Sequence, residues 1–198
     1  MIVIDAKQVM ELRNLTGAGV VDAKNALEEA GGDMDKAIEI LKKKGAAKAA
    51  KKSGERTTSE GIVAAYIHHT KKLGSLIELQ CETDFVARNE EFQTLAQDIA
   101  MQVAAIDPLY ISVVDIPVNE LDKQREIFMA EMAEENKPEE IKNKIIEGKL
   151  NKWYSEVCLM NQAFFKDEDK TIAELLEEKI AKIGEKIVVK RMTRYHIS

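Results

Sequence analysis

Apolar residues recur every three or four positions in three short segments near the start of the chain, which is the spacing of one helix face. The pattern predicts helices over residues 6–15, 21–30 and 33–45. Glycine pairs separate the segments, one of them within residues 16–19 (TGAG), and glycine permits the backbone angles of tight turns. We therefore expect a three-helix module that spans residues 1–45.

The segment that follows, residues 46–59, offers little to bury, because alanine, lysine and small polar residues dominate it. Six lysines and no acidic residue lie from Lys42 to Lys52. A patch that binds nucleic acid is one interpretation, but no aromatic residue is interleaved to stack on bases. We interpret residues 46–59 as a solvated, mobile linker.

Strand patterns occur near the start and at the end of the remaining region, residues 60–198. Residues 61–69 and 75–81 are rich in strand formers, and the glycine within residues 70–74 predicts a hairpin between them. Residues 186–195 form a third strand pattern, so this core closes only when the chain end returns. Three strands with helices on one face predict an α+β fold with a small three-stranded antiparallel sheet.

Helical patterns fill the region between the second and third strands. The expected helices span residues 89–105, 119–136, 138–157 and 171–183. Leu121, Phe128 and Met132 form a narrow apolar stripe, and the charged segment around them favours a helical hairpin. Pro138 suits the first position of a helix, and an interruption of that helix near Gly148 stays open.

One stretch, from Cys81 to Phe92 (CETDFVARNEEF), lies where a strand pattern ends and a helical pattern begins. Asp84 and Phe85 form an acid–aromatic pair at this turn. A strand-to-helix turn presents side chains outward on a rigid support, which suits a probe that enters another molecule. The alternative is structural: Phe85 plugs the core beneath the helix, and Asp84 caps that helix.

Composition narrows the class of protein. The 198 residues are 45% apolar and 32% charged, which is typical of a soluble globular chain with one domain and a small module. The net charge of −6 argues against nucleic-acid binding by the whole chain, because phosphate binding needs a basic face. Neither a signal-peptide pattern nor an apolar run near the ~18 residues of a membrane span occurs. We expect a cytoplasmic protein.

Candidate chemistry is sparse. Cys81 and Cys158 each lie inside an apolar pattern, which predicts two buried, reduced thiols. His68 and His69 are candidate ligands of a metal ion. Adjacent residues on a strand point to opposite faces, however, and cannot easily bind the same ion. No phosphate-binding loop or nucleophile elbow occurs, and His196 has no evident base or nucleophile around it. We expect no enzymatic activity, no cofactor and no metal site.

Several segments resemble one family, in the order in which that family carries them. Residues 82–88 (ETDFVAR) are similar to the central signature of the elongation factor Ts family, the guanine-nucleotide exchange factors of elongation factor Tu. Residues 12–27 resemble its ubiquitin-associated-like N-terminal domain. Residues 149–162 and 184–191 resemble the segment before its last helix and the end of its short members. From its 198 residues we expect the chain to lack room for both the second core subdomain and the coiled-coil insertion of the long members.

The resemblance implies a function. The protein would bind elongation factor Tu in its GDP-bound and nucleotide-free states, dislodge Mg²⁺ and promote GDP release so that GTP can bind. The residues that correspond to the family's Mg²⁺-displacing turn are Thr83, Asp84, Phe85 and Val86, with Phe85 as the wedge. The residues that correspond to its contacts with the partner's G domain are Arg13, Val20 and Val21.

The chain also departs from the family pattern. The family often has methionine at the positions of Val20 and Val21, cysteine at that of Ala23 and proline at that of Ala163. Because valine is shorter and stiffer than methionine, the apolar contact at Val20 and Val21 should be smaller. The structural alternative for these two valines is that they start a helix and fill its core.

Two other classes of function stay open. One is an adaptor whose three-helix module binds another helix or tail, and the other is an RNA-binding protein that uses the lysine-rich linker. We expect no direct nucleic-acid binding and no membrane partner. A homodimer is a further expectation, because a second copy would complete a core without its second subdomain, and residues 119–157 are the expected contact.

Overall fold

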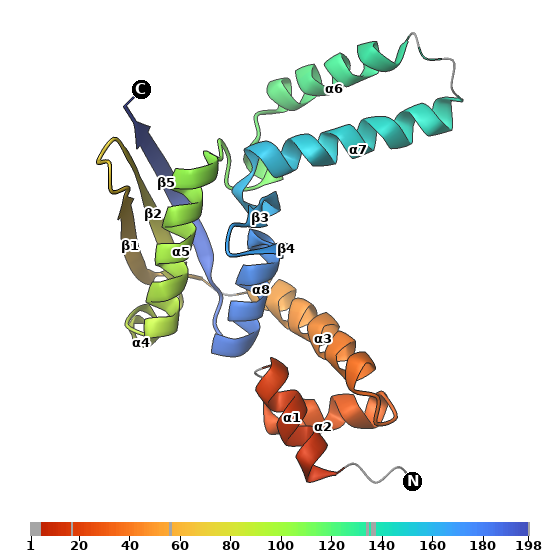
Figure 1. Cartoon of the computed structure of the whole chain (residues 1–198), viewed down its shortest axis with the longest axis vertical. Helices are drawn as coiled ribbons and strands as arrows, with labels where there is room; N and C mark the ends of the chain where they lie inside the picture. The colour runs from red at the N-terminus through yellow and green to blue at the C-terminus, as the bar shows by residue number, and fades with distance from the viewer. Residues whose placement is uncertain (1–4, 17, 56, 134, 136–137, 198) are drawn as a thin grey trace.

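The computed structural model describes the chain apart from residues 1–4, 17, 56, 134, 136–137 and 198, and apart from the side chains of residues 45–55. Gly17, which belongs to the first predicted turn, therefore lies outside the described residues. The fold is the expected mixture of helices and a small antiparallel sheet. Figure 1 shows three parts: N-terminal helices, a core around the sheet, and a helical pair that projects from the core.

The N-terminal part contains the three predicted helices, α1 (Ala6–Thr16), α2 (Val20–Glu29) and α3 (Met34–Glu55). Its small core is apolar and includes Leu12, Ala23, Leu27 and Ala37, each fully buried. Three of the six buried residues in this cluster are alanines, so the apolar side chains that hold the helices together are few and small.

The third helix is longer than predicted. It continues past Gly45, where the sequence predicts its end, as far as Glu55. Alanine and lysine dominate residues 46–52 and are good helix formers, and α3 packs against α8 (Ile172–Ile183) of the core (Figure 1). Tertiary packing of this kind stabilises a helix with a weak apolar face. The division of the chain into residues 1–45, 46–59 and 60–198 stays a prediction.

The sheet has three antiparallel strands in the order β1 (Glu60–Ile67), β2 (Leu73–Cys81) and β5 (Val188–His196). The predicted hairpin and the predicted return of the chain end are both confirmed. The register between β2 and β5 shifts between Glu78 and Leu79, so that Lys190 has no partner residue on β2. Gly61 has a φ of 154°, and a side chain there would meet the carbonyl group of Leu79 on β2.

One face of the sheet is covered by α5 (Glu90–Ile106), and α8 contributes its apolar side to the same core (Figure 1). This arrangement buries an apolar core that includes Ile77, Leu79, Phe92, Ile99 and Ile172. The other face carries Val63, Ile67, Leu76 and Tyr195, all exposed. Among the described residues, no helix packs against that second face.

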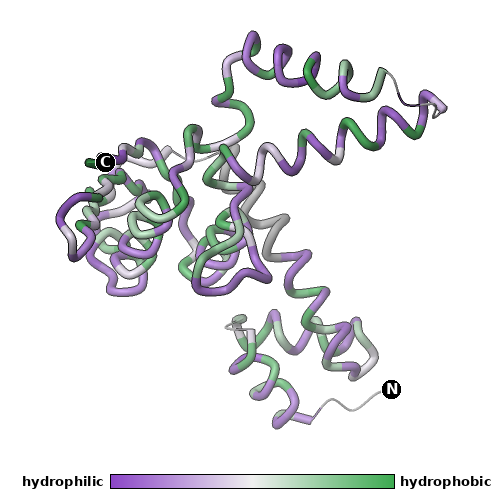
Figure 2. Tube along the Cα trace, turned by 45° about the horizontal axis from the view of Figure 1, so that its top comes forward, coloured by the Kyte–Doolittle hydropathy of each residue, from purple (hydrophilic) through white to green (hydrophobic). Residues whose placement is uncertain are grey.

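The helical pair consists of α6 (Val118–Ala133) and α7 (Glu139–Val157), which run antiparallel away from the core (Figure 1). It has a core of its own, formed by Met132, Ile146 and Leu150. The predicted hairpin and stripe are thus confirmed, and α7 passes through Gly148 without a break. Green apolar positions recur along both tubes in Figure 2, separated by purple polar ones. The pair is therefore a two-helix unit with a narrow apolar seam.

The sequence interpretation missed the hairpin of β3 (Ala163–Phe164) and β4 (Asp167–Thr171). Four of the five β4 residues are charged, which disfavours a strand by propensity. The amide of Gln102, which is fully buried on α5, holds the hairpin in place. Its Nε2 donates to the Ala163 carbonyl at 3.0 Å, and its Oε1 accepts from the Phe165 N–H at 3.0 Å.

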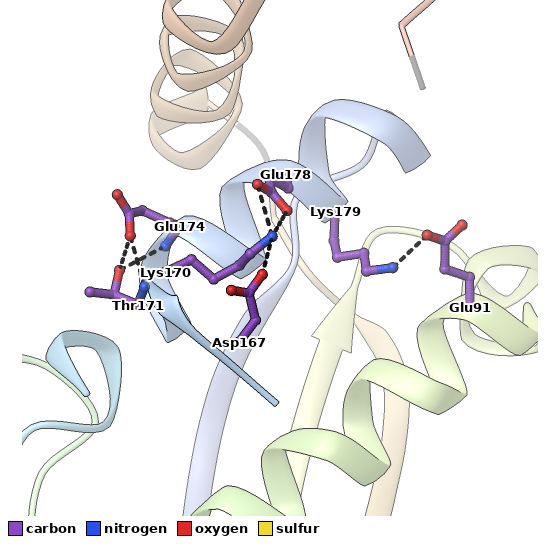
Figure 3. Close-up of polar contacts among 7 residues, drawn as sticks. All are labelled: Glu91, Asp167, Lys170, Thr171, Glu174, Glu178 and Lys179. Atoms are coloured by element: carbon purple, nitrogen blue, oxygen red, sulfur yellow. Dashed lines mark hydrogen bonds and ion pairs between the residues drawn. The ribbon is translucent and has the colours of Figure 1, made fainter. Parts of the chain in front are cut away.

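The start of α8 is stabilised by polar contacts (Figure 3). Thr171 and Glu174 form a capping box: the Thr171 N–H donates to Glu174 Oε2 at 2.7 Å, and the Glu174 N–H donates to Thr171 Oγ1 at 3.2 Å. The bond from the Thr171 backbone holds the pKa of Glu174 below its ordinary value. Lys170 contacts Glu178 at 3.0 Å and Asp167 at 3.1 Å, and these bonds raise the pKa of Lys170.

A second set of ion pairs joins α8 to α5. Glu91 on α5 accepts from Lys179 Nζ at 2.6 Å, as Figure 3 shows, and from Lys182 Nζ at 2.9 Å. The hydrogen bonds from Lys179 and Lys182 hold the pKa of Glu91 below its ordinary value of 4.5. The helices α5 and α8 are thus linked at their surface as well as through the core.

We expect Glu91→Gln to lower the free energy of unfolding near neutral pH and to lose this effect in acid. Since the folded-state pKa of Glu91 lies below its unfolded value, the carboxylate stabilises the fold above about pH 4.5, and this stabilisation is lost as pH falls through the folded pKa. Urea unfolding of both proteins in steps from neutral pH to about pH 3 measures the difference.

Glu140→Gln is the matched control, because Glu140 pairs with Lys144 on the solvent side of α7. Its effect near neutral pH should stay below about 0.5 kcal/mol. A difference for Glu91→Gln that stays constant into acid would contradict the role given to its ion pairs.

Candidate functional site

The turn after β2 presents Phe85 to solvent. β2 ends at Cys81, and the single-turn helix α4 (Asp84–Ala87) follows at once. The Phe85 side chain is 83% exposed, whereas Ala87 is buried and Val86 is half-buried. The helix therefore directs Ala87 and Val86 toward the core and Phe85 away from it. The alternative interpretation of Phe85 as a core plug is wrong.

The cap of α4 is Thr83, not Asp84. Thr83 has extended backbone angles, and its Oγ1 accepts from the Val86 N–H at 3.4 Å. Asp84 instead pairs with Arg88, with 3.1 Å between Oδ2 and Nη2. The following helix, α5, is capped by Asn89, whose Oδ1 accepts from the Glu91 N–H at 2.8 Å. The interpretation of Asp84 as a helix cap is therefore wrong as well.

Hydrogen bonds from the far end of the chain hold this turn. One oxygen of Glu185, Oε2, accepts from the backbone N–H groups of Glu82 and Thr83, each at 3.1 Å. The other oxygen, Oε1, accepts from the Thr83 hydroxyl at 2.7 Å. In return, Glu82 Oε1 accepts from the Lys186 N–H at 2.6 Å. We call these four hydrogen bonds the 82–185 bridge; the sequence interpretation missed it.

Cys81 lies directly beneath the turn and is fully buried. Its Sγ donates to the Thr83 carbonyl at 3.2 Å. Burial, with the neighbouring Glu185 carboxylate, raises the pKa of the Cys81 thiol to about 11, and burial raises that of Cys158 to about 11. Both cysteines are free thiols, as predicted, and neither is activated as a nucleophile.

The second group of predicted site residues lies on the N-terminal helices. Arg13 on α1 is exposed, and Val20 and Val21 at the start of α2 are 51% and 70% exposed. The alternative interpretation, that these valines fill the module's core, is wrong. Their exposure leaves all three residues available to a partner. They lie on a different part of the molecule from Phe85 (Figure 1).

The histidine pair and the other candidate metal ligands form no convincing site in the described part of the chain. β1 ends at Ile67, so His68 and His69 lie in the loop after it, with ring centroids 4.0 Å apart. The argument from strand alternation therefore does not apply to this pair. No group of three or more His, Cys, Asp or Glu side chains suited to a metal ion occurs among the described residues. None of the described helices is both long and apolar enough to cross a membrane.

Comparison with known proteins gives a consistent result. The family model described as "Elongation factor TS" matches residues 35–198. The elongation factor Ts of Desulfitobacterium hafniense is 53% identical over 194 residues, which cover 98% of this chain and 89% of that protein. Those of Thermosipho melanesiensis and Thermotoga petrophila are 52% and 53% identical and cover 98% and 96% of this chain, and 98% and 94% of their own lengths.

Cys81 supplies a test of how firmly the turn is held. We expect thiol reagents to label the native Cys158→Ala variant slowly, because Cys81 is buried and its pKa of about 11 leaves little thiolate near neutral pH. The measurement is the rate of colour release from a disulfide reagent, compared with the rate in denaturant. Rapid labelling of the native protein would contradict a closed turn.

Proposed function

The chain belongs to the elongation factor Ts family, and we propose that it is the guanine-nucleotide exchange factor that releases GDP from elongation factor Tu. Membership of the family places it in translation elongation. The observation that carries the proposal is the exposed Phe85 on a braced turn, within the segment ETDFVAR that resembles the family's signature. A bulky aromatic side chain that its own protein leaves in solvent is suited to enter another molecule.

The proposed mechanism has no covalent step. Phe85 enters the partner beside its Mg²⁺ site and displaces the elements that hold the cation. Thr83 and Val86 support the turn from within, and Asp84 lies beside Phe85 at the surface, where its carboxylate can meet a polar group of the partner. Loss of the Mg²⁺ leaves the GDP phosphates less neutralised, so the nucleotide dissociates and GTP can bind.

Magnitudes indicate that Phe85 does not act alone. Burial of a phenylalanine side chain contributes roughly 1.5–3 kcal/mol. Weakening a bound nucleotide by about 10⁴-fold requires about 5.5 kcal/mol. We assign part of the remainder to the exposed residues Arg13, Val20 and Val21 on the N-terminal helices. The coupling is reciprocal, so GDP expels the factor as strongly as the factor expels GDP.

The proposal also includes the location of the protein, its need for a cofactor and its self-association. We propose a cytoplasmic protein that uses no cofactor of its own and does not bind nucleic acid directly. We further propose that two copies associate in the absence of the partner. The open face of the sheet supports this association more than residues 119–157 do, because Val63 and Tyr195 on that face are 67% and 70% exposed and Ile67 and Leu76 are exposed beside them. Sedimentation of the free protein tests it.

We expect Phe85→Ala to slow factor-stimulated release of fluorescent GDP from elongation factor Tu while leaving the fold intact. The exposed ring makes few contacts within its own chain, so the free energy of unfolding should change by less than about 0.5 kcal/mol. Phe92→Ala is the matched comparison: that ring is fully buried, and its removal should cost about 3–5 kcal/mol of stability. If a folded Phe85→Ala protein stimulates GDP release as well as wild type does, the proposed insertion of the Phe85 ring into the partner is wrong.

We expect Val21→Ser to raise the concentration of factor needed for half-maximal stimulation by several-fold, because an apolar contact of about 1 kcal/mol is lost from docking. The maximal rate should change less, since the Phe85 turn is intact. Lys24→Ala, also on α2, removes an exposed pair with Glu28 and serves as control.

If the wild-type chain fails to accelerate GDP release at all, the better proposal is an adaptor whose three-helix module binds another helix or tail.

A further inference from the structure

The helix that carries Phe85 is too short to hold its own shape. α4 has four residues, and an isolated single helical turn is unfavourable because nucleation costs more than one hydrogen bond returns. Its cap bond, from the Val86 N–H to Thr83 Oγ1, is long at 3.4 Å. Its apolar contact with the core is small and comes from the buried Ala87 and the half-buried Val86. Support from another element is therefore needed to give Phe85 one orientation.

Glu185 supplies that support. Its carboxylate, in the connection between α8 and β5, accepts three hydrogen bonds from Glu82 and Thr83, two of them from consecutive backbone N–H groups. The third comes from the Thr83 hydroxyl, and this orients the lone pairs of Oγ1 toward the Val86 N–H. Hydrogen bonds to an ionised acceptor are the strong ones. The cap of α4 therefore depends on a residue that lies 102 positions away in the sequence.

The connection that carries Glu185 is itself well anchored. Gly184 ends α8 in the left-handed conformation, with φ 89°, and Ile187 is buried in the main core. The Lys186 N–H also donates to Glu82 Oε1. The connection between α8 and β5 and the turn after β2 are thus joined by two carboxylates, one from each segment. The turn is thereby fixed to α8 and to the start of β5.

We propose that Glu185 is a positioning residue for nucleotide exchange, which rests on the proposed function. Its carboxylate fixes the start of α4 and so gives the exposed Phe85 ring the orientation in which it enters the partner. Glu185 itself does not contact the nucleotide or its Mg²⁺. Without it, the turn samples several conformations, and only the fraction with Phe85 correctly placed is competent.

The test compares Glu185→Ala with Glu185→Gln in release of fluorescent GDP from elongation factor Tu. Both variants remove the negative charge, but only Gln keeps an oxygen for the backbone N–H groups and an amide for Thr83. We expect Glu185→Ala to lower the maximal rate about tenfold, with a much smaller change in the half-maximal concentration, and Glu185→Gln to retain most of the rate. Glu178→Ala is the control, because Glu178 on α8 pairs with Lys170 and does not touch the turn.

A double-mutant cycle separates positioning from general destabilisation. If Glu185 acts through the Phe85 ring, adding Glu185→Ala to Phe85→Ala should cause little further loss of rate. In the Cys158→Ala background, Cys81 labelling should be faster in Glu185→Ala than in Glu185→Gln, although both lack the charge that helps to raise the pKa of Cys81.

Three results would overturn the inference: a Glu185→Ala protein as active as wild type, equal losses in Glu185→Ala and Glu185→Gln, or additive losses in the double mutant. A wild-type chain that does not stimulate release at all would refute the proposed function instead. In that case faster Cys81 labelling in Glu185→Ala would still establish that the bridge holds the turn. If Glu185→Ala does not fold, Glu82→Ala is the second variant, because it removes the bond from the Lys186 N–H and leaves the Glu185 carboxylate in place. It should show a smaller loss in the same direction, and wild-type rates would count against the inference.

Discussion

The pairing of β5 with β2 is the interaction on which the rest of the core depends. β2 is the central strand, and its second partner comes from the end of the chain. This pairing brings α8 into the apolar core that α5 shares and brings Glu185 against Glu82 and Thr83. One contact of high sequence separation thus completes the apolar core and also supports the exposed turn. The entropy lost in closing this long loop is offset by the apolar burial of α5 and α8 in the shared core.

Two phenylalanines, Phe85 in this turn and Phe92 on the helix after it, have opposite roles. Phe92 is fully buried and joins α5 to the sheet, whereas Phe85 on α4 is 83% exposed. A large exposed aromatic ring favours association with other molecules. The structure places the Phe85 ring on one short helix and holds that helix with charged hydrogen bonds. Polar bonds rather than apolar burial therefore define the shape of the turn, and this leaves the ring itself free to contact a partner.

The N-terminal helices and the α6–α7 pair each have a small apolar core that is separate from the core beneath the sheet. The N-terminal helices pack around Leu12 and Leu27, and the projecting pair packs around Met132 and Leu150. At the foot of the pair, the Tyr110 hydroxyl donates to Glu120 at 2.5 Å, and the Leu159 N–H donates to the Tyr110 carbonyl at 2.9 Å. A binding free energy larger than one side chain can provide is consistent with contacts distributed over such parts.

The sequence by itself determined the number, type and approximate limits of the longer elements, because apolar periodicity and glycine punctuation are local signals. It also marked Thr83 to Val86 and Arg13, Val20 and Val21 as candidate site residues through family resemblance. Only the tertiary structure decided that Phe85 points outward, that Thr83 rather than Asp84 is the cap, and that α3 continues past Gly45. The β3–β4 hairpin and the 82–185 bridge were likewise invisible in the sequence. Each depends on a partner far away in the chain, Gln102 for the hairpin and Glu185 for the bridge, and no local pattern encodes which distant side chain will arrive there.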